Sequence, residues 1–447
     1  MSGLTNAQRE GLRALMSGLN DVRLGKVATA VRAMPGETAE ALQVMIGVEL
    51  RERNRKLRVL GPLLPMFRAR RDDVQALTFP PVVLDRLWAA ARTAEPELLT
   101  RLDGGEAEAA LVAERLGIAA ANAVRDRPDD IWPDAYLEAL ENLILCLDLL
   151  AVARRAAAGL EGWLKRPDEE QLAALRLVLR DAEAISPEGP RALLDILFAH
   201  MDDAVLVLRL LPHLSGAAAS VSLMSGSEFG VFVDRLVAAM QMRAGRINTF
   251  RPGRNMAGLE AVMDDLDWCA TVLAEMDVVL DPEPHSAWGQ VMRKTRQSVG
   301  GTLSNLIAAS GSAVEAGLPM TRTPLAGRTT RRTPRLDAET TPGPDAAGPL
   351  LKFVAGLRKT APVFGCEAER QRLVEALTIR LSDYADEALT LVNNGDVADK
   401  PGALKQIKRA ATWLALIEAR DAARSVRRRV AVADGVAPAE KASSDAA

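Results

Sequence analysis

The apolar side chains between Met256 and Leu280 recur at spacings of three and four residues, the periodicity of one helix face. The stripe consists of Met256, Leu259, Met263, Leu266, Ala270 and Leu273. A second apolar row, Val262, Cys269 and Met276, runs beside it at intervals of seven residues. An apolar face this wide is typical of a helix inside a multi-helix bundle rather than of a two-stranded coiled coil.

The composition extends this prediction to the whole chain of 447 residues. Apolar residues make up 48% and aromatic residues only 4%, while the strong helix formers Ala, Leu, Arg and Glu dominate. Val is the one frequent residue that favours strands. Prolines and glycines interrupt the helical patterns, and no repeat of fixed period is present. We therefore expect an all-α protein, either an irregular multi-helix bundle or an array of helix pairs.

The pattern predicts four segments along the chain. Residues 1–318 form a helical body that opens with a helix from Leu4 to about Met34, and a subdivision is possible near 128–134 or 215–227. Residues 319–349 hold six prolines and seven threonines with hardly any large apolar side chain, which predicts a disordered Thr/Pro/Arg linker. The last two segments are a small C-terminal helical module over 350–430 and a disordered tail over 431–447.

Charge is unevenly distributed although the net charge is only −3. Residues 321–430 carry 20 Lys and Arg against 13 Asp and Glu, a net of +7, and the tail carries −2, so residues 1–320 carry −8. Such asymmetry indicates either an acidic partner or contact between the two parts. Arg outnumbers Lys 46 to 10, and this Ala- and Arg-rich usage suggests a bacterium with a GC-rich genome.

The distribution of cysteines and apolar runs predicts a reduced cytoplasmic compartment. The three cysteines lie more than 90 residues apart, which argues against a disulfide framework and a Cys-rich zinc site. Nothing in residues 1–20 resembles a signal peptide. The longest apolar run, Leu143–Val152, contains Asp148 and is far shorter than the roughly 20 residues that span a bilayer.

Three arginine-rich segments are the candidate binding sites for an anion or a partner. The first contains Arg243, Arg246, Arg251 and Arg254; the second, in the linker, contains Arg328, Arg331 and Arg332; the third, near the end of the last helix, contains Arg424, Arg427 and Arg428. Guanidinium groups beside a helix N-terminus or on a flexible segment can hold phosphate or carboxylate. Each segment also has a purely structural interpretation: a solvated loop paired with acids, a soluble tether, or cations stabilising a helix C-terminus.

The sequence contains few residues or motifs that indicate catalysis. His200, His213 and His285 have no partner at ligand spacing, and no nucleotide-binding or nucleophile motif is present. The acidic clusters Asp202-Asp203 and Asp264-Asp265 with Asp267 could hold Mg²⁺ only if several carboxylates met on one helix face. We expect no catalytic residue, no metal and no cofactor.

These observations favour a non-catalytic helical adaptor, scaffold or regulatory protein that mediates protein–protein interaction; its oligomeric state stays open. Two alternatives remain. The chain could associate with nucleic acid or an anionic membrane through its arginine-rich segments, or it could be an all-α enzyme with a carboxylate cluster.

Overall fold

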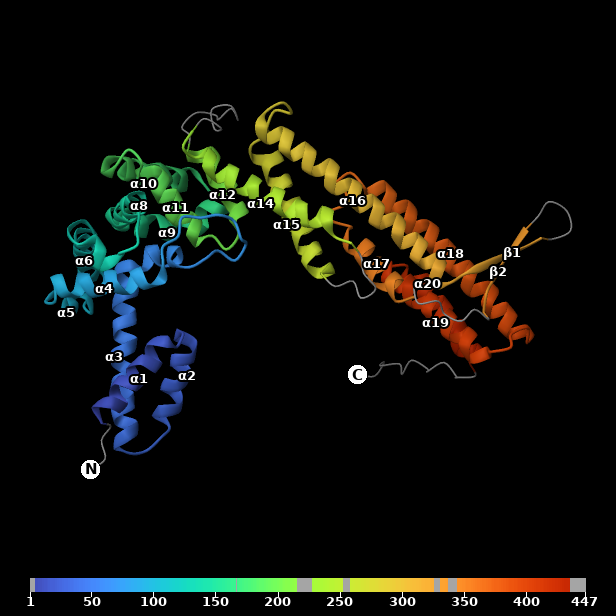
Figure 1. The fold of residues 1–447 in the computed structure, drawn as a ribbon, viewed down its shortest axis with the longest axis horizontal. Helices are drawn as coiled ribbons and strands as arrows, with labels where there is room; N and C mark the ends of the chain where they lie inside the picture. The colour runs from blue at the N-terminus through green and yellow to red at the C-terminus, as the bar shows by residue number, and fades with distance from the viewer. Residues whose placement is uncertain are drawn as a thin grey trace, which may run out of the picture. The chain divides into compact units, whose positions relative to one another are not determined.

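The computed structural model describes residues 5–165, 167–214, 227–251, 258–324, 330–336 and 344–434. Within these ranges the regular secondary structure is helical except for one two-stranded ribbon, which confirms the predicted all-α fold (Figure 1). The chain divides into two compact units: unit 1 comprises residues 1–219 and 226–232, and unit 2 comprises residues 220–225 and 233–447. The division crosses residues 219–233, beside one of the two places where the sequence allows a subdivision.

Unit 1 consists of short and medium helices joined by proline- and glycine-containing turns. They are α1 (Asn6–Gly18), α2 (Asp21–Arg32), α3 (Glu37–Leu60), η1 (Gly61–Phe67), α4 (Pro81–Ala94), α5 (Leu98–Leu102), α6 (Glu106–Asp126), α7 (Pro128–Ile131), α8 (Leu137–Asp148), α9 (Leu150–Leu164), α10 (Glu169–Ile185), α11 (Gly189–His200), η2 (Ala204–Leu206) and α12 (Val207–Leu214). Within the unit, α6 packs against α4 and α8, and α9 packs against α10 and α11.

Two helices occupy the segment that the sequence predicts as one helix from Leu4 to Met34. The chain breaks at Asn20, whose side chain accepts a hydrogen bond from the Arg23 amide and caps α2. A polar side chain that competes for backbone amides favours a helix start over a helix interior. The break lets α1, α2 and the first half of α3 enclose a small core that includes Met16, Leu24 and Ile46.

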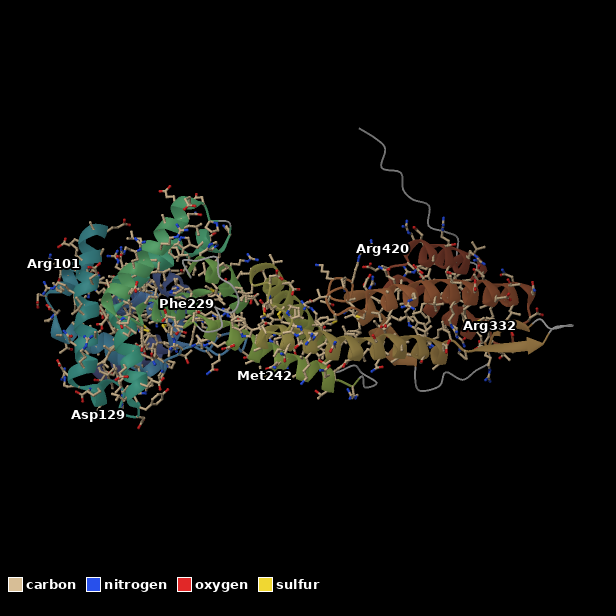
Figure 2. All side chains as sticks on the ribbon, turned by 90° about the horizontal axis from the view of Figure 1, so that it is seen from above. Arg101, Asp129, Phe229, Met242, Arg332 and Arg420 are labelled. Carbon is tan, nitrogen blue, oxygen red and sulfur yellow. The ribbon has the colours of Figure 1, made fainter. Side chains whose placement is uncertain are left out.

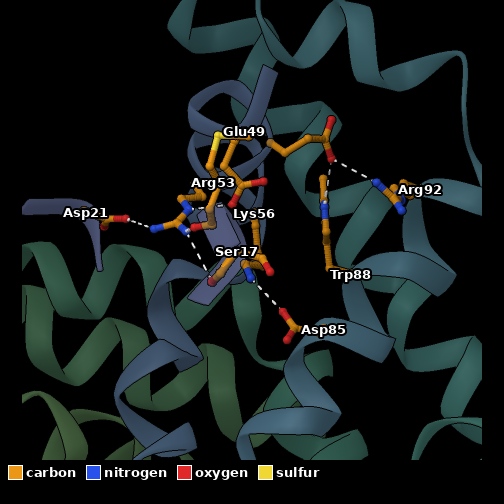
Figure 3. Close-up of polar contacts among 10 residues, drawn as sticks. Ser17, Asp21, Glu49, Arg53, Lys56, Asp85, Trp88 and Arg92 are labelled. Atoms are coloured by element: carbon orange, nitrogen blue, oxygen red, sulfur yellow. Dashed lines mark hydrogen bonds and ion pairs between the residues drawn. The ribbon is translucent and has the colours of Figure 1, made fainter. Parts of the chain in front are cut away.

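Basic residues on α3 are paired with acids on neighbouring helices. Arg53 contacts Asp21 at 2.7 Å and Glu49 at 2.8 Å, and it also donates to the carbonyl of Met16 at 2.8 Å (Figure 3). Lys56 pairs with Asp85 of α4 at 2.8 Å (Figure 3). These contacts tie α3 to α2 and to α4, so its base-rich side is part of the packing of unit 1.

Unit 2 contains the longest helices of the described chain. Its elements are α14 (Gly230–Thr249, whose first turn belongs to unit 1), α15 (Leu259–Val279), α16 (Ala287–Gly317), β1 (Met320–Pro324), β2 (Thr330–Pro334), α17 (Pro344–Gly356), α18 (Glu367–Asn394), α19 (Lys400–Leu416) and α20 (Arg420–Ala433). Leu266, Cys269 and Leu273 of α15 are fully buried, as the apolar stripe predicts for a bundle helix. Among the described helices, none has a stretch long and apolar enough to cross a membrane.

One apolar core joins the end of α16 to the C-terminal helices. Val314 and Leu318 belong to the same buried cluster as Tyr384 of α18, Trp413 of α19 and Val426 of α20. The expected boundary between a body ending at 318 and a separate module beginning at 350 therefore differs from the packing. The structure places residues on both sides of that boundary in a single unit, because α16 packs along α17 and α18.

Part of the predicted disordered linker is also structured. Residues 320–324 and 330–334 pair as antiparallel strands, with Arg322 opposite Arg332 in the register, and α17 already begins at Pro344. The ladder is favoured by the threonines, whose β-branched side chains suit a strand. Residues 325–329 and 337–343 of this linker, and 435–447 of the predicted tail, lie outside the described residues.

Candidate functional site

The first arginine-rich segment has one buried member, Arg243, in the core of unit 2. Arg243 of α14 is only 8% exposed, its guanidinium carbon lies 4.2 Å from the centre of the Trp268 ring, and it contacts Asp265 at 3.4 Å. Arg246, one turn later, donates two hydrogen bonds to the buried Asp265 carboxylate. Arg243 is therefore a packed and paired core residue, as the structural interpretation expects, whereas Arg246 is paired with the same acid but stays partly exposed.

The rest of that segment offers no assembled site among the described residues. Arg251 donates to the carbonyl oxygens of Asn248 and Phe250, at 2.9 and 2.8 Å, and thereby caps the end of α14. Arg254 lies outside the described residues. Arginine at a helix C-terminus satisfies carbonyls that no longer have a helical partner.

The other two segments lie in unit 2, in different surroundings. Arg332 of β2 is exposed, and Figure 2 shows it on the strand ribbon. Arg328 lies outside the described residues, and so does the side chain of Arg331. Arg424, Arg427 and Arg428 are exposed on α20, the helix on which Figure 2 labels Arg420. Of these three, only Arg424 has an ion pair with a described residue, at 2.8 Å from Asp421 of the same helix.

Arg332 lines a cavity of about 630 Å³ in unit 2. We call it the α18 groove, because α18 supplies most of its lining residues while α16 and the two strands supply the rest. Its lining consists of Gly311, Glu315, Met320, Arg332, Leu373, Ala376, Leu377, Ile379, Arg380, Asp383, Asp386 and Glu387. The groove forms because β2 lies against α18, while α16 runs beside that helix.

The α18 groove combines an apolar surface with an acidic rim. Ile379 is 64% exposed and supplies apolar surface beside Leu373 and Leu377 in the lining. Four carboxylates against two arginines give the lining a net charge of −2. Glu315 pairs with Arg380 at 2.7 Å, and Asp386 pairs with Arg429. Asp383 is exposed and forms no ion pair with a described residue.

Among the described residues, no group of three or more His, Cys, Asp or Glu side chains could hold a metal ion. Asp265, part of the acidic cluster that the sequence singled out, is buried against arginines rather than open to a ligand. The Nε2 atom of His200 lies 2.7 Å from the carbonyl oxygen of Pro62, which is a packing contact.

The cysteines are buried free thiols. Burial raises the pKa of Cys269 to about 12 and that of Cys366 to about 11, with Asp265 and Glu369 adding to the respective shifts. Burial also raises the pKa of the Cys146 thiol. A thiol rather than a thiolate is a weak nucleophile and a weak metal ligand, so these three residues serve the core.

The sequence predicted Arg332 but missed the rest of the α18 groove. The apolar series Leu373, Leu377 and Leu381 marks the side of α18 that faces its neighbours, and Ile379 falls between these positions. An isoleucine off the buried stripe is the signal that could have been noticed. The acids Asp383 and Asp386 carry no such signal, because charged residues on a helix surface are ordinary.

No protein-family model, no curated protein and no solved structure matches this chain.

Proposed function

We propose that the protein is a non-catalytic helical adaptor and that a segment of a partner protein binds in the α18 groove. The exposed Ile379 side chain inside an acid-rimmed groove is the observation that carries this proposal. Grooves between helices accept amphipathic helices, whose apolar face is buried while the charged flanks meet the rim. The net charge of −2 favours a partner helix that carries Lys or Arg beside its apolar stripe.

The experiment uses charge reversal at a position that the fold does not need. Asp383→Arg changes the groove charge without removing an ion pair among the described residues. Glu375→Arg is the matched control, because Glu375 is exposed on the same helix but does not line the groove. The probe is a labelled peptide of about 18 residues, five helical turns, with leucines on one face and lysines on its flanks.

We expect Asp383→Arg to weaken binding of this peptide at least about tenfold in fluorescence anisotropy, which corresponds to about 1.4 kcal/mol. Ile379→Glu should have a similar effect by placing a charge where the apolar face docks. Glu375→Arg should bind like the unmodified chain. Equal affinities for all four proteins, or no measurable binding, would show that the groove is not the adaptor site.

One observation favours a second function, association with phosphate-bearing polymers or surfaces. Arg420, Arg424, Arg427 and Arg428 are all exposed and recur at the spacing of one face of α20. A cationic stripe on a helix binds phosphates without reading sequence, and its affinity falls steeply with salt.

This function is tested with a double variant, Arg427→Glu with Arg428→Glu, assayed on duplex DNA and on anionic vesicles over a salt series. If the stripe binds phosphates, the variant should bind more weakly and show a shallower dependence on salt. The logarithmic slope should fall by about 0.9 for each DNA phosphate that the variant no longer neutralises. A variant that matches the unmodified chain at low salt would contradict this function.

A further inference from the structure

Aromatic side chains are scarce in this chain, yet four of the sixteen line one groove of unit 1. Phe67, Phe79, Trp132 and Tyr136 surround a cavity of about 430 Å³, which we call the aromatic groove. The Phe79 ring lies 5.5 Å from the Phe67 ring and meets the Trp132 ring edge-on, at 6.1 Å and 86°. Phe67 and Phe79 are only 4% and 2% exposed, so they form the floor of the groove, and Trp132 and Tyr136 are the rings that a ligand can reach.

The wall of the aromatic groove is held in place by buried polar contacts. The segment between η1 and α4 has no helix or strand, and the Phe79 amide donates to the carbonyl oxygen of Met66 at 2.8 Å. Further along this segment, Arg70 donates to the carbonyl oxygens of Phe198 and Met201 and pairs with Asp72 at 2.8 Å. The groove is therefore formed before any ligand arrives, which lowers the entropy cost of binding.

The open side of the aromatic groove carries side chains that are available to a ligand. Tyr136 is 69% exposed, a large solvent-facing area for one of only two tyrosines. Asn142 lines the groove and forms no hydrogen bond with a described residue. Arg68 is exposed at the rim and has no ion pair within the described part of the chain. The lining thus offers ring faces, an amide, a phenol and one positive charge, with no negative charge among its residues.

We propose that the aromatic groove binds an extended, proline-containing segment of a partner protein that carries Asp or Glu beside its prolines. Proline rings pack against accessible aromatic side chains such as Trp132 and Tyr136, and a polyproline helix is rigid before binding. Such a segment has no internal hydrogen bonds, so its carbonyl oxygens can accept from the Tyr136 hydroxyl and the Asn142 amide. The uncompensated charge of Arg68 selects an acidic flank over a basic one.

This site is independent of the α18 groove, because every residue that lines it belongs to unit 1 and its preferred partner charge is opposite. The full chain would then hold two partners of different chemistry, one cationic and helical, the other acidic and extended. If one site does not bind its peptide, binding at the other site can still be tested.

The experiment measures binding of three labelled peptides to the full chain by fluorescence anisotropy: a proline-rich peptide with glutamates, the same peptide with arginines in their place, and the leucine–lysine helix. We expect the acidic proline peptide to bind most tightly and Tyr136→Ala to weaken it at least tenfold. Trp132→Ala should do the same, and Arg68→Glu should reverse the preference between the two proline peptides. Leu177→Ala is the control, because Leu177 is also an exposed apolar residue of unit 1, at 55%.

Trp132 is partly buried, so thermal melting must show that the Trp132→Ala variant folds. If that variant does not fold, Tyr136→Ala still tests the proposal, because it removes a mostly exposed ring. Absence of binding by the acidic proline peptide would overturn the proposal. Binding that survives Tyr136→Ala would overturn it too, and so would displacement of that peptide by the leucine–lysine helix.

Discussion

The guanidinium of Arg246 donates two hydrogen bonds to the carboxylate of Asp265, at 2.6 and 2.8 Å. Arg243 contacts the same carboxylate from the previous turn of α14, so one buried acid serves two arginines. This arrangement holds α14 against α15 and explains why a cluster of positive charge is compatible with the interior of unit 2. A buried charge is tolerated only where an opposite charge and hydrogen bonds compensate it.

Asp265→Asn should destabilise unit 2, because it removes the negative charge that compensates Arg243. Breaking a buried pair by removing one partner costs about 3–5 kcal/mol, and we expect the lower end because Arg246 is 47% exposed on its side chain. Urea unfolding followed by circular dichroism measures the change. Asp264→Asn, an exposed neighbour on α15, is the control and should be within about 0.5 kcal/mol of the unmodified chain. Equal effects of the two substitutions would contradict a structural role for Asp265.

Because of Asp72, the stability of unit 1 should depend on pH under acidic conditions. Burial acts to raise the pKa of Asp72, but hydrogen bonds from Arg70 and from the amides of Ala204 and Val74 outweigh it and hold that pKa below its usual value. An acid with a lowered pKa in the folded state stabilises the fold above its unfolded pKa, about 3.9, and loses this contribution as the pH falls through the folded value.

The measurement is thermal unfolding of Asp72→Asn and the unmodified chain between about pH 3 and pH 7, a range that includes the unfolded pKa of an aspartate. We expect the variant to be less stable at neutral pH and the difference to shrink below about pH 4. Asp73→Asn is the control, since Asp73 is exposed and its φ of 56° is a conformation that Asn also tolerates. A difference that stays constant over this range would argue against the linkage.

Two adjacent glycines of α16 should respond in opposite directions to alanine. A Cβ at Gly300 would lie 2.4 Å from the carbonyl oxygen of Phe364, whereas a Cβ at Gly301 would meet nothing within 4 Å. We expect Gly300→Ala to cost about 1–3 kcal/mol through overpacking and Gly301→Ala to add about 0.5–1 kcal/mol through helix propensity. Urea midpoints compare the two directly. Stabilisation by both substitutions would mean that α16 does not approach Phe364 this closely.

The three cysteines should resist alkylation in the folded protein. Their thiols are buried, and their raised pKa values leave little thiolate at neutral pH. Intact mass after iodoacetamide treatment should show no added groups on the native chain and three after denaturation. Rapid labelling of Cys269 without denaturant would indicate that the contact region of α14 and α15 opens readily.

The helical class and much of the helix pattern could be predicted from the amino-acid sequence, because they depend on neighbours within one or two turns. The stripe through Leu266 and Leu273 places these residues in a core wherever α15 is packed. The capping side chain of Asp168 marks the start of α10 in the same local way, by accepting from the Gln171 amide. The break at Asn20 uses equally local chemistry, but a continuous apolar stripe across Leu12, Leu19 and Val22 concealed it.

The surroundings of the charged and aromatic residues emerged only from the packing of the helices. Arg246 and Asp265 lie on different helices, and their pairing depends on how α14 lies against α15. Phe67 and Trp132 reach the same groove from distant parts of the chain. Local periodicity carries no information about contacts between residues that are distant in the sequence. Such contacts depend on how whole helices pack, and that packing is set by the sum of many weak contacts across the core.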